Sequence, residues 1–577
     1  MQKISQFLVL LTAFITNTGF SQNINNNKKT LFSPPLDIPL LLSGNYAEIR
    51  STAFHAGIDI KTQQVEGKNV LAADDGYISR IAIQSGSYGK AVYMKHPGGL
   101  VTVYGHFSSF APELEKYVTD QQYLKKSFTV DLYPEPGRFT FKKGELIGLS
   151  GNTGNSGGPH LHFEIRDESS TIPLNVLNYE LPITDNIPPT IGWLAVYPVD
   201  RQNKIIGGNN ELLIKTEGTG NRFTVSPAVI PVNGNIAFGI ESYDYLNNSA
   251  NSCTPYTIEL LLDNKQIYFC RFDSIPFSMM NYVKSHIDYG EKVKSGKVIH
   301  RLFVEPNNRL KIYKVAVNRG IISITDTRVH NVLINVTDTY GNRSVLQFDI
   351  RNTGEVNTQF KDEQRNNVVS KFTYSASNSF ENDSVRIMIP ANALFDDLDF
   401  MYRHIPDSNN IKDIYQIHNE YIPLLNSYIL SIKPFNVPTS LLNKSYIAIL
   451  GNDNTSSSQG GEYHNGYITT QTRLFGKFYL ATDTISPAIN PLRFRNNSTY
   501  SEGDTISFKI TDDQTGVRSY NGYIDNQWSL FEYDGKNDLL FYKIDGERLQ
   551  HNVLHSLEVI VTDNKDNVNR YTGSFRF

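Results

Sequence analysis

The chain has 577 residues, with 54 Lys plus Arg against 58 Asp plus Glu, and a formal net charge of -4. At roughly 150 residues per domain this length predicts several domains, and 40% hydrophobic with 12% aromatic residues suffices for buried cores, so a wholly disordered chain is excluded. The near-neutral charge balance, without blocks of like charge, gives no electrostatic basis for binding nucleic acid. Abundant Tyr (33) and Phe (32) favour a mainly β protein.

The N-terminus has the pattern of a secretory signal peptide. Lys3 precedes an apolar run at residues 7–15, and Gly19 and Ser21 place small residues before a cut after position 21. We therefore expect residues 1–21 to be removed and the mature chain to be exported, to the periplasm or the cell surface. No later run reaches the roughly 18 apolar residues of a membrane span, so we expect no transmembrane segment in the mature chain.

Residues 30–184 are expected to form one antiparallel β domain, because short β runs alternate there with turn signals. An insert at residues 111–141 interrupts it. The insert holds a helix-like stretch at 113–118 and two strand-like segments, 128–132 and 138–141, which we expect to pair as a hairpin. The strands of the domain are expected at residues 76–83, 91–95, 100–104, 142–148 and 161–165.

Two phrases repeat in the C-terminal part of the chain. The segment Asp185–Ile191 resembles Asp483–Ile489, and Val336–Asn342 resembles Val561–Asn567. Each pair brackets a unit of alternating strands and Asx or Gly turns, which is typical of a β-sandwich. We therefore predict Ig-like β-sandwich domains at residues 185–352 and 483–577, and a β-rich middle domain at 353–482 that we interpret as another sandwich. Asp338 and Asp563, at strand ends, are interpreted as Asx-turn residues rather than calcium ligands.

The only two cysteines are Cys253 and Cys270. A hairpin turning at Asp263-Asn264 is predicted between them, and its register places Thr257, not Cys253, opposite Cys270. A disulfide between the two cysteines is left open.

Histidines cluster in three short phrases of the N-terminal domain. His55 and Asp59 are four residues apart, His106 follows Tyr104-Gly105, and His160 and His162 flank Leu161. On a strand His160 and His162 point to the same face, with Leu161 towards the core. Two imidazoles and one carboxylate are the ligand set of a hydrolytic zinc site with one open position, so the three segments are expected to converge.

The remaining histidines are interpreted as structural. His96 opens a predicted turn, and we expect it to be solvated. Between residues 185 and 577 the histidines occur singly and form no expected catalytic cluster.

These phrases, with the lead-in Gly148–Gly154, resemble the LytM/lysostaphin-type zinc metallopeptidases, peptidase family M23, over about residues 45–167. The resemblance implies that His55, Asp59 and His162 bind Zn²⁺. It also implies that His106 and His160 line the open side of the metal and act catalytically. The insert departs from simpler members of the family, and we hypothesise that it narrows or gates the groove.

The chemistry expected of such a site is peptide hydrolysis. Zinc lowers the pKa of a water from about 15.7 to about 7 and polarises the scissile carbonyl. No His-Glu-x-x-His motif supplies a glutamate base, so His106 and His160 are the candidates to move the proton, with their individual roles open. The resemblance implies endopeptidase cleavage of peptidoglycan cross-linking peptides.

Two other hypotheses belong to different classes. One is a non-cutting or gated module that binds or regulates cell-wall hydrolases. Proteins of that kind have usually lost zinc ligands. The other is an adhesin or structural protein built from the C-terminal sandwiches. Those sandwiches are predicted to contact the cell wall or partner proteins, or to act as spacers, which is the default reading.

Overall fold

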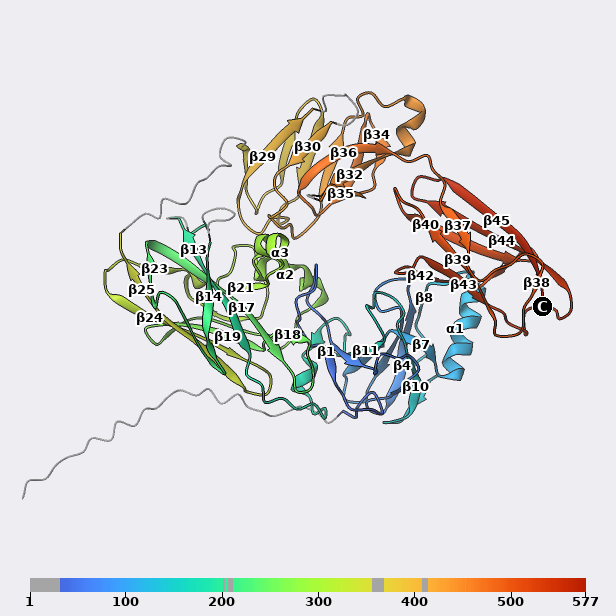
Figure 1. The fold of residues 1–577 in the computed structure, drawn as a ribbon, viewed down its shortest axis with the longest axis horizontal. Coiled ribbons are helices and arrows are strands. Elements are labelled where there is room, and N and C mark those ends of the chain that lie inside the picture. Colours follow the sequence, from blue (N-terminus) through green and yellow to red (C-terminus); the bar gives the residue numbers. More distant parts are fainter. Residues whose placement is uncertain (1–31, 201–202, 206–210, 355–367, 407–412, 452) are drawn as a thin grey trace, which may run out of the picture.

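The computed structural model describes residues 32–200, 203–205, 211–354, 368–406, 413–451 and 453–577, so the predicted signal peptide lies outside the described residues. The expected fold class is confirmed, because the chain is mainly β, with an antiparallel N-terminal unit followed by further β-sheet units. The units follow one another around a ring (Figure 1). None of the helices in the described ranges has the length and apolar character needed to cross a bilayer.

Two antiparallel sheets form the N-terminal unit. The strands of the larger sheet, apart from two in the insert, are β1 (Leu42–Gly44), β2 (Ile58–Lys61), β4 (Gly76–Ile83), β5 (Lys90–Lys95), β6 (Val101–Gly105), β11 (His160–Arg166) and β12 (Pro173–Leu174). The smaller sheet contains β3 (Asn69–Leu71), β7 (Phe107–Phe110) and β10 (Leu146–Ser150). In the larger sheet β11 lies between β2 and β6. Their buried side chains, including Ile58, Leu161 and Phe163, share one core, as alternation predicts.

The insert contains one helix, α1 (Pro112–Lys125), which is longer than the predicted stretch. Pro112 suits the first turn of a helix because its missing N–H has no intrahelical partner there, and the Glu115 carboxylate accepts from the backbone N–H of Phe110 at 2.7 Å. The predicted hairpin is wrong. β8 (Val130–Leu132) and β9 (Thr140–Phe141) both pair with β4 rather than with each other, because β4 is long enough to accept both along one edge.

The second unit is a 13-stranded sheet system. Its strands are β13 (Thr190–Val199), β14 (Leu212–Thr219), β15 (Arg222–Val225), β16 (Val229–Val232), β17 (Gly234–Tyr245), β18 (Ser252–Cys253), β19 (Thr257–Leu262), β20 (Lys265–Arg271), β21 (Ile299–Arg301), β22 (Tyr313–Ala316), β23 (Ile322–Ile324), β24 (Val329–Thr337) and β25 (Arg343–Asn352). β14 pairs with β13 through its first half and with β15 through its second, which joins the two faces of the unit around one core.

The hairpin β19–β20 turns at the predicted residues. Asp263 and Asn264 both have positive φ, at 48° and 64°, as a two-residue type I′ turn requires. The predicted register is wrong by one residue, because a bulge between Leu260 and Leu261 places Ile258 opposite Cys270. Cys253 and Cys270 are both buried free thiols.

The last two units each contain two sheets. The middle unit has β26 (Val368–Phe372), β27 (Asn378–Glu381), β28 (Val385–Ile389), β29 (Leu398–Ile405), β30 (Ile414–Ile417), β31 (Tyr428–Ile432), β32 (Ser445–Leu450), β33 (Ser456–Ser458), β34 (Glu462–His464), β35 (Tyr467–Thr472) and β36 (Gly476–Thr482). The C-terminal unit has β37 (Ala488–Pro491), β38 (Ser498–Thr499), β39 (Thr505–Thr511), β40 (Val517–Ile524), β41 (Gln527–Ser529), β42 (Glu532–Asp534), β43 (Leu539–Lys543), β44 (Leu554–Asp563) and β45 (Val568–Arg576). Each pair of sheets encloses its own apolar core.

Five of the short helices of the described residues lie in the first two units, and one lies in the middle unit. The five are η1 (Val176–Asn178), η2 (Phe277–Tyr282), α2 (Val283–His286), α3 (Tyr289–Ser295) and η3 (Val317–Gly320), and the one in the middle unit is η5 (Thr439–Lys444).

The C-terminal unit closes the ring by packing on the insert helix (Figure 1). Tyr123 of α1 contacts the ring of Trp528 edge-on, and the Arg548 guanidinium lies 3.7 Å from the centre of the Tyr123 ring. On β5, outside the insert, Lys90 forms an ion pair with Glu532 of the C-terminal unit at 3.1 Å. Thus the insert serves as a docking surface for the last unit of the chain.

We expect Glu532→Gln to loosen this closure, because Lys90 is only 7% exposed and its buried ammonium would lose its ion-pair partner, with only the more distant charge of Glu115 remaining. The expected loss is about 1.5–3 kcal/mol of the docking free energy, the range for a hydrogen bond to a charged group. Small-angle X-ray scattering would report a larger radius of gyration. Asp566→Asn, which removes the exposed Arg518 pair of the same unit, is the matched control, and equal radii for both variants would refute the role of Lys90.

Candidate metal centre

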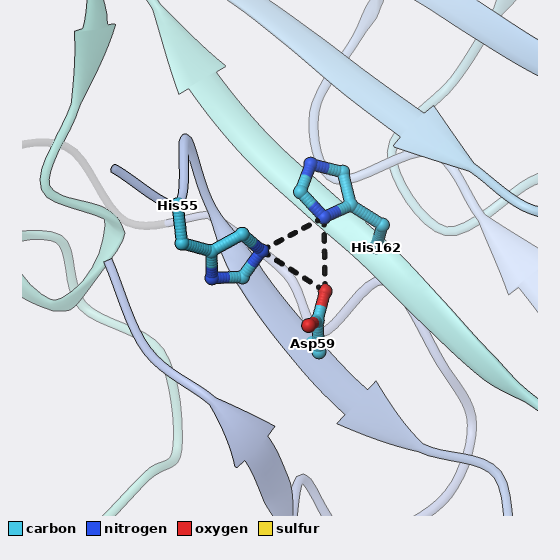
Figure 2. A group of neighbouring side chains, drawn as sticks. All are labelled: His55, Asp59 and His162. Atoms are coloured by element: carbon cyan, nitrogen blue, oxygen red, sulfur yellow. Dashed lines mark hydrogen bonds and ion pairs between the residues drawn. The ribbon is translucent and has the colours of Figure 1, made fainter. Parts of the chain in front are cut away.

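Three side chains converge over two neighbouring interior strands of the larger N-terminal sheet. Asp59 on β2 lies directly opposite His162 on β11, and His55 precedes β2. The Asp59 Oδ1 atom is 3.1 Å from His55 Nε2 and 2.9 Å from His162 Nδ1, and the two nitrogens are 3.1 Å apart (Figure 2). All three residues are buried. The structure therefore gathers the three sequence-predicted ligands around one point.

The outer nitrogen of each imidazole has its own acceptor. His55 Nδ1 is 2.7 Å from the carbonyl oxygen of Asn45, and His162 Nε2 is 2.8 Å from Glu164 Oε1. These acceptors assign protons to the outer nitrogens, so His55 Nε2 and His162 Nδ1 are the nitrogens that face Asp59 and would offer lone pairs to a metal ion. The arrangement is the one that metal-binding histidines need.

The hairpin that carries His55 is anchored in the second unit. Tyr46 and Phe54 belong to the apolar core of that unit, not to the core of the N-terminal sheet. The Asn45 side chain also donates to the carbonyl of Thr254 at 2.8 Å and accepts from the Thr254 N–H at 2.9 Å. The second unit thus fixes the position of one candidate ligand, which is more than a spacer would do.

The electrostatics of the site favour a cation. Burial by itself would raise the pKa of Asp59. The charge of His55 and the hydrogen bonds from the neighbouring histidines outweigh burial and hold that pKa well below its usual range. Likewise, although burial disfavours a charged ring, hydrogen bonds to Asp59 and Glu164 raise the pKa of His162 to about 9. Two buried carboxylates flank one imidazole, and a divalent ion between the lone pairs would replace the proton that His162 otherwise carries. The donor set fits such an ion.

His106 and His160 lie on one side of this group. Their ring centroids are 4.6 Å apart, and the His106 ring is 5.9 Å from that of His162. His106 Nδ1 donates to the carbonyl of Thr153 at 2.7 Å, and His160 Nδ1 lies 2.9 Å from the carbonyl of Gly158. His160 Nε2 is 3.4 Å from Asp59 Oδ1. Burial, followed by the charges of His160 and His162, lowers the pKa of His106 to about 3.

The loop at residues 152–154 receives contacts from the C-terminal unit. The Lys536 ammonium donates to the carbonyl oxygen of Asn152, and it lies 3.5 Å from that of Gly154. Between them, Thr153 provides the carbonyl that accepts from His106. The last unit of the chain therefore touches the segment that orients one of the candidate catalytic histidines.

Two predictions about other histidines are wrong. His96 is 4% exposed rather than solvated. Its Nδ1 donates to the backbone carbonyl of Asp75, its Nε2 is hydrogen-bonded to the Thr102 hydroxyl, and Phe32 covers its ring. His286 and His300 do not occur singly but meet at 3.0 Å inside the second unit. Burial lowers the pKa of both, so they pack as neutral rings.

Residues 53–129 match the family described as Peptidase family M23. The chain carries a peptidase family M23 domain. In the middle unit, residues 369–483 match the Zu5-like domain, a resemblance that sequence reasoning did not reach.

Proteins similar to the M23 domain include peptidases. An uncharacterized metalloprotease of Haemophilus influenzae is 35% identical over 132 residues, which are 23% of this chain and 22% of that protein. The DD-carboxypeptidase/endopeptidase Mpg of Neisseria meningitidis is 33% identical over 128 residues, 22% of this chain and 23% of that one. The catalytic domain of the M23 protein EnpA from Enterococcus faecalis is 24% identical, over 24% of this chain and 87% of that one, with a TM-score of 0.18. The chain thus spans less than a quarter of the length of the two curated relatives.

Three partners of the M23 site were not predicted. Glu164 stands two residues after His162 on β11, so period-two spacing would have placed it on the same face. Its carboxylate also receives Arg166 Nε at 2.6 Å. Asn45 and Thr153 act through backbone carbonyls, which any residue type provides, so no sequence signal could have indicated them.

Glu164→Gln is expected to weaken zinc binding about 10–100-fold, because an amide no longer holds the His162 proton as a carboxylate does. Competition with a chelating dye would measure the affinity. Glu168→Gln, on an exposed carboxylate near the same strand, is the control and should bind zinc like wild type. Unchanged affinity in Glu164→Gln, with the native circular dichroism spectrum retained, would contradict the orienting role.

Metal binding should release a proton from His162. The pKa of this ring is about 9 in the protein without metal, so it is protonated below that pH and must lose the proton to bind an ion. The affinity should therefore fall about tenfold for each pH unit below 9 through this proton alone. Isothermal titration of zinc in buffers of different ionisation enthalpy measures the released protons, and a count of zero at pH 7.5 would contradict the expectation.

Proposed function

We propose that residues 30–184 form a zinc-dependent endopeptidase that hydrolyses peptide cross-links of bacterial peptidoglycan. The observation that carries the proposal is the buried triad of His55 Nε2, Asp59 Oδ1 and His162 Nδ1, with two further histidines on one side of it. Two nitrogens and one oxygen leave a fourth tetrahedral position for water or substrate.

Zinc is the metal that this donor set fits best, with His55, Asp59 and His162 as the residues that would hold it. When bound, it would act as a Lewis acid on a peptide carbonyl and lower the pKa of a water molecule. Arg50 lies 2.6 Å from the other oxygen of Asp59, Oδ2, which leaves Oδ1 as the oxygen that faces the histidines.

The two remaining histidines receive different roles in this proposal. The pKa of His106, about 3, keeps its ring neutral, so its Nε2 accepts a hydrogen bond and does not store the proton. His160 is the more exposed of the two, and its Nε2 lies 3.4 Å from Asp59 Oδ1. We assign His160 Nε2 as the atom that carries the proton to the leaving amine.

The substrate and the cellular location rest on different grounds. Relatives of the M23 domain include the peptidoglycan DD-endopeptidase ShyA of Vibrio cholerae, which is 26% identical over 188 residues, 31% of this chain and 37% of that protein. Peptidoglycan lies outside the cytoplasmic membrane, and the signal-peptide pattern of residues 1–21 would bring the chain there, to the periplasm or the surface. The C-terminal units would then contact the wall or other envelope proteins. A non-cutting regulatory module is not favoured, because both histidines beside the triad are present.

The zinc-loaded mature protein should release fragments from cross-linked muropeptides, as detected by liquid chromatography. His162→Ala should lose the metal and the activity, because one of three ligands is gone. His160→Ala should keep about one zinc per chain and lower kcat/KM by about 10²–10⁴-fold.

His404→Ala is the control, since it removes an exposed histidine of the middle unit that stacks on Tyr415 and lies 3.5 Å from Asp413, far in sequence from the triad. Its activity should match wild type. A wild-type protein that holds zinc but releases nothing from cross-linked muropeptides would overturn the proposed substrate.

A further inference from the structure

A second group of potential ligands lies where the M23 domain meets the second unit. One oxygen from each of Asp185, Asp244 and Asp338 lies within 4.8 Å of the others. Asp185 belongs to the segment that leads into β13, Asp244 lies near the end of β17, and Asp338 directly follows β24. Three segments that are distant in sequence thus bring three carboxylates to one point.

The local hydrogen bonds do not satisfy this trio. Asp338 forms the predicted Asx turn and accepts from the N–H groups of Tyr340 and Asn342, both at 2.8 Å. Asp244, by contrast, is 3% exposed, and its Oδ1 has no hydrogen-bond partner. Asp185 Oδ2 is also buried with no donor group in hydrogen-bond range, and the carboxyl group of Asp185 lies beside that of Asp338. Burying an unpaired carboxylate is costly, so these two oxygens point to a missing cation.

The C-terminal unit contains a matching trio of aspartates, but there hydrogen-bond donors reach all three carboxylates. Asp483, Asp512 and Asp563 occupy the corresponding places before β37, after β39 and at the end of β44. There the Thr515 hydroxyl donates to Asp483, and backbone N–H groups donate to the other two carboxylates. None of these three residues has an orphaned buried oxygen among the described atoms.

The two repeats also differ in one charged residue. In the repeated phrase, Lys565 stands two residues after Asp563, and its ammonium interacts electrostatically with Asp483 and Asp563. The matching residue after Asp338 is Tyr340, which carries no positive charge. In the described part of the chain no basic side chain forms an ion pair with the first trio. Lys565 thus places a positive charge near the C-terminal trio, although its ammonium donates to the carbonyl of Gly461 and not to a carboxylate of that trio. Tyr340 places no positive charge near the first trio.

We propose that Asp185, Asp244 and Asp338 bind a calcium ion that fastens the M23 domain to the second unit. Carboxylate oxygens are hard ligands, which calcium accepts in irregular geometries. Magnesium demands a near-octahedral shell and retains several waters, and zinc prefers nitrogen and sulfur, so both suit this buried trio less well. Without an ion, burial and the mutual proximity of the carboxylates raise the pKa of Asp185 to about 7 and that of Asp244 to about 8.

The position of the trio explains what the ion would do. Leu246 and Cys253, on either side of the turn after β17, belong to the apolar core of the M23 domain, and Tyr340 packs against that core. The Asn342 side chain donates to the carbonyl of Asp185 at 3.2 Å. A calcium ion here would join the connecting segment to both strand ends, and so fix the joint between the two units.

The test is isothermal titration of calcium chloride into the zinc-loaded full-length mature protein, with thermal unfolding as a second readout. Wild type should bind one calcium with a Kd of roughly 10⁻⁴ to 10⁻³ M, the range of extracellular modules, and unfold at a higher temperature when calcium is present. Asp244→Asn should weaken calcium binding at least about tenfold without changing the zinc content. Its unfolding midpoint without calcium should be close to that of wild type at pH 7, because a carboxyl group whose pKa is about 8 is then mostly neutral and is replaced by a neutral amide of the same shape.

Asp512→Asn is the matched control in the C-terminal repeat and should keep the wild-type calcium affinity. If Asp244→Asn fails to fold, Asp185→Asn, at a less buried position, must show the same loss. The proposal is overturned if wild type shows neither heat nor a shifted midpoint up to about 10 mM calcium. It is also overturned if magnesium binds as tightly, or if Asp512→Asn loses as much affinity as Asp244→Asn. These readouts do not involve peptide cleavage, so they remain informative whatever the M23 domain cuts.

Discussion

The pairing of β2 with β11 is the constraint on which the candidate site depends. It sets Asp59 directly opposite His162, so that two of the three donors are fixed by backbone hydrogen bonds between neighbouring strands. Because side chains alternate along a strand, the same register directs Leu161 into the core and places His160 and Glu164 on the face of His162. A slip of one residue would turn the histidines towards the apolar core and the core side chains towards the site, so the fold and the site depend on the same register.

The third donor depends on a different part of the molecule. His55 follows a hairpin whose apolar side chains pack in the second unit, and the acceptor of its outer nitrogen is held there by Thr254. The geometry of the triad therefore couples to the angle between the first two units. On the opposite side Lys536 of the last unit holds the loop that positions His106. A site formed by one domain is thus supported by three.

The sequence was informative where chemistry and local period coincide. The His-x-His pair, the four-residue spacing of His55 and Asp59, and the turn at Asp263-Asn264 each depend on residues close in sequence. Tertiary pairing decided the rest. The two strands of the insert, β8 and β9, pair with β4 and not with each other. The bulge between Leu260 and Leu261 shifts by one residue the position opposite Cys270. His96 is buried because Phe32, 64 residues away, covers it, which no local turn signal indicates.

The contact between Lys536 and Asn152 also sets an order of events. The two residues are 384 positions apart, and the chain is synthesised from its N-terminus. At about 5–20 residues per second, roughly 20 to 80 seconds separate the appearance of the loop from that of its last partner. During that interval the residues of β2 and β11 have been synthesised, while the loop behind His106 lacks the ammonium that holds it in the finished molecule. Completion of the ring is therefore the final step in shaping the surroundings of His106.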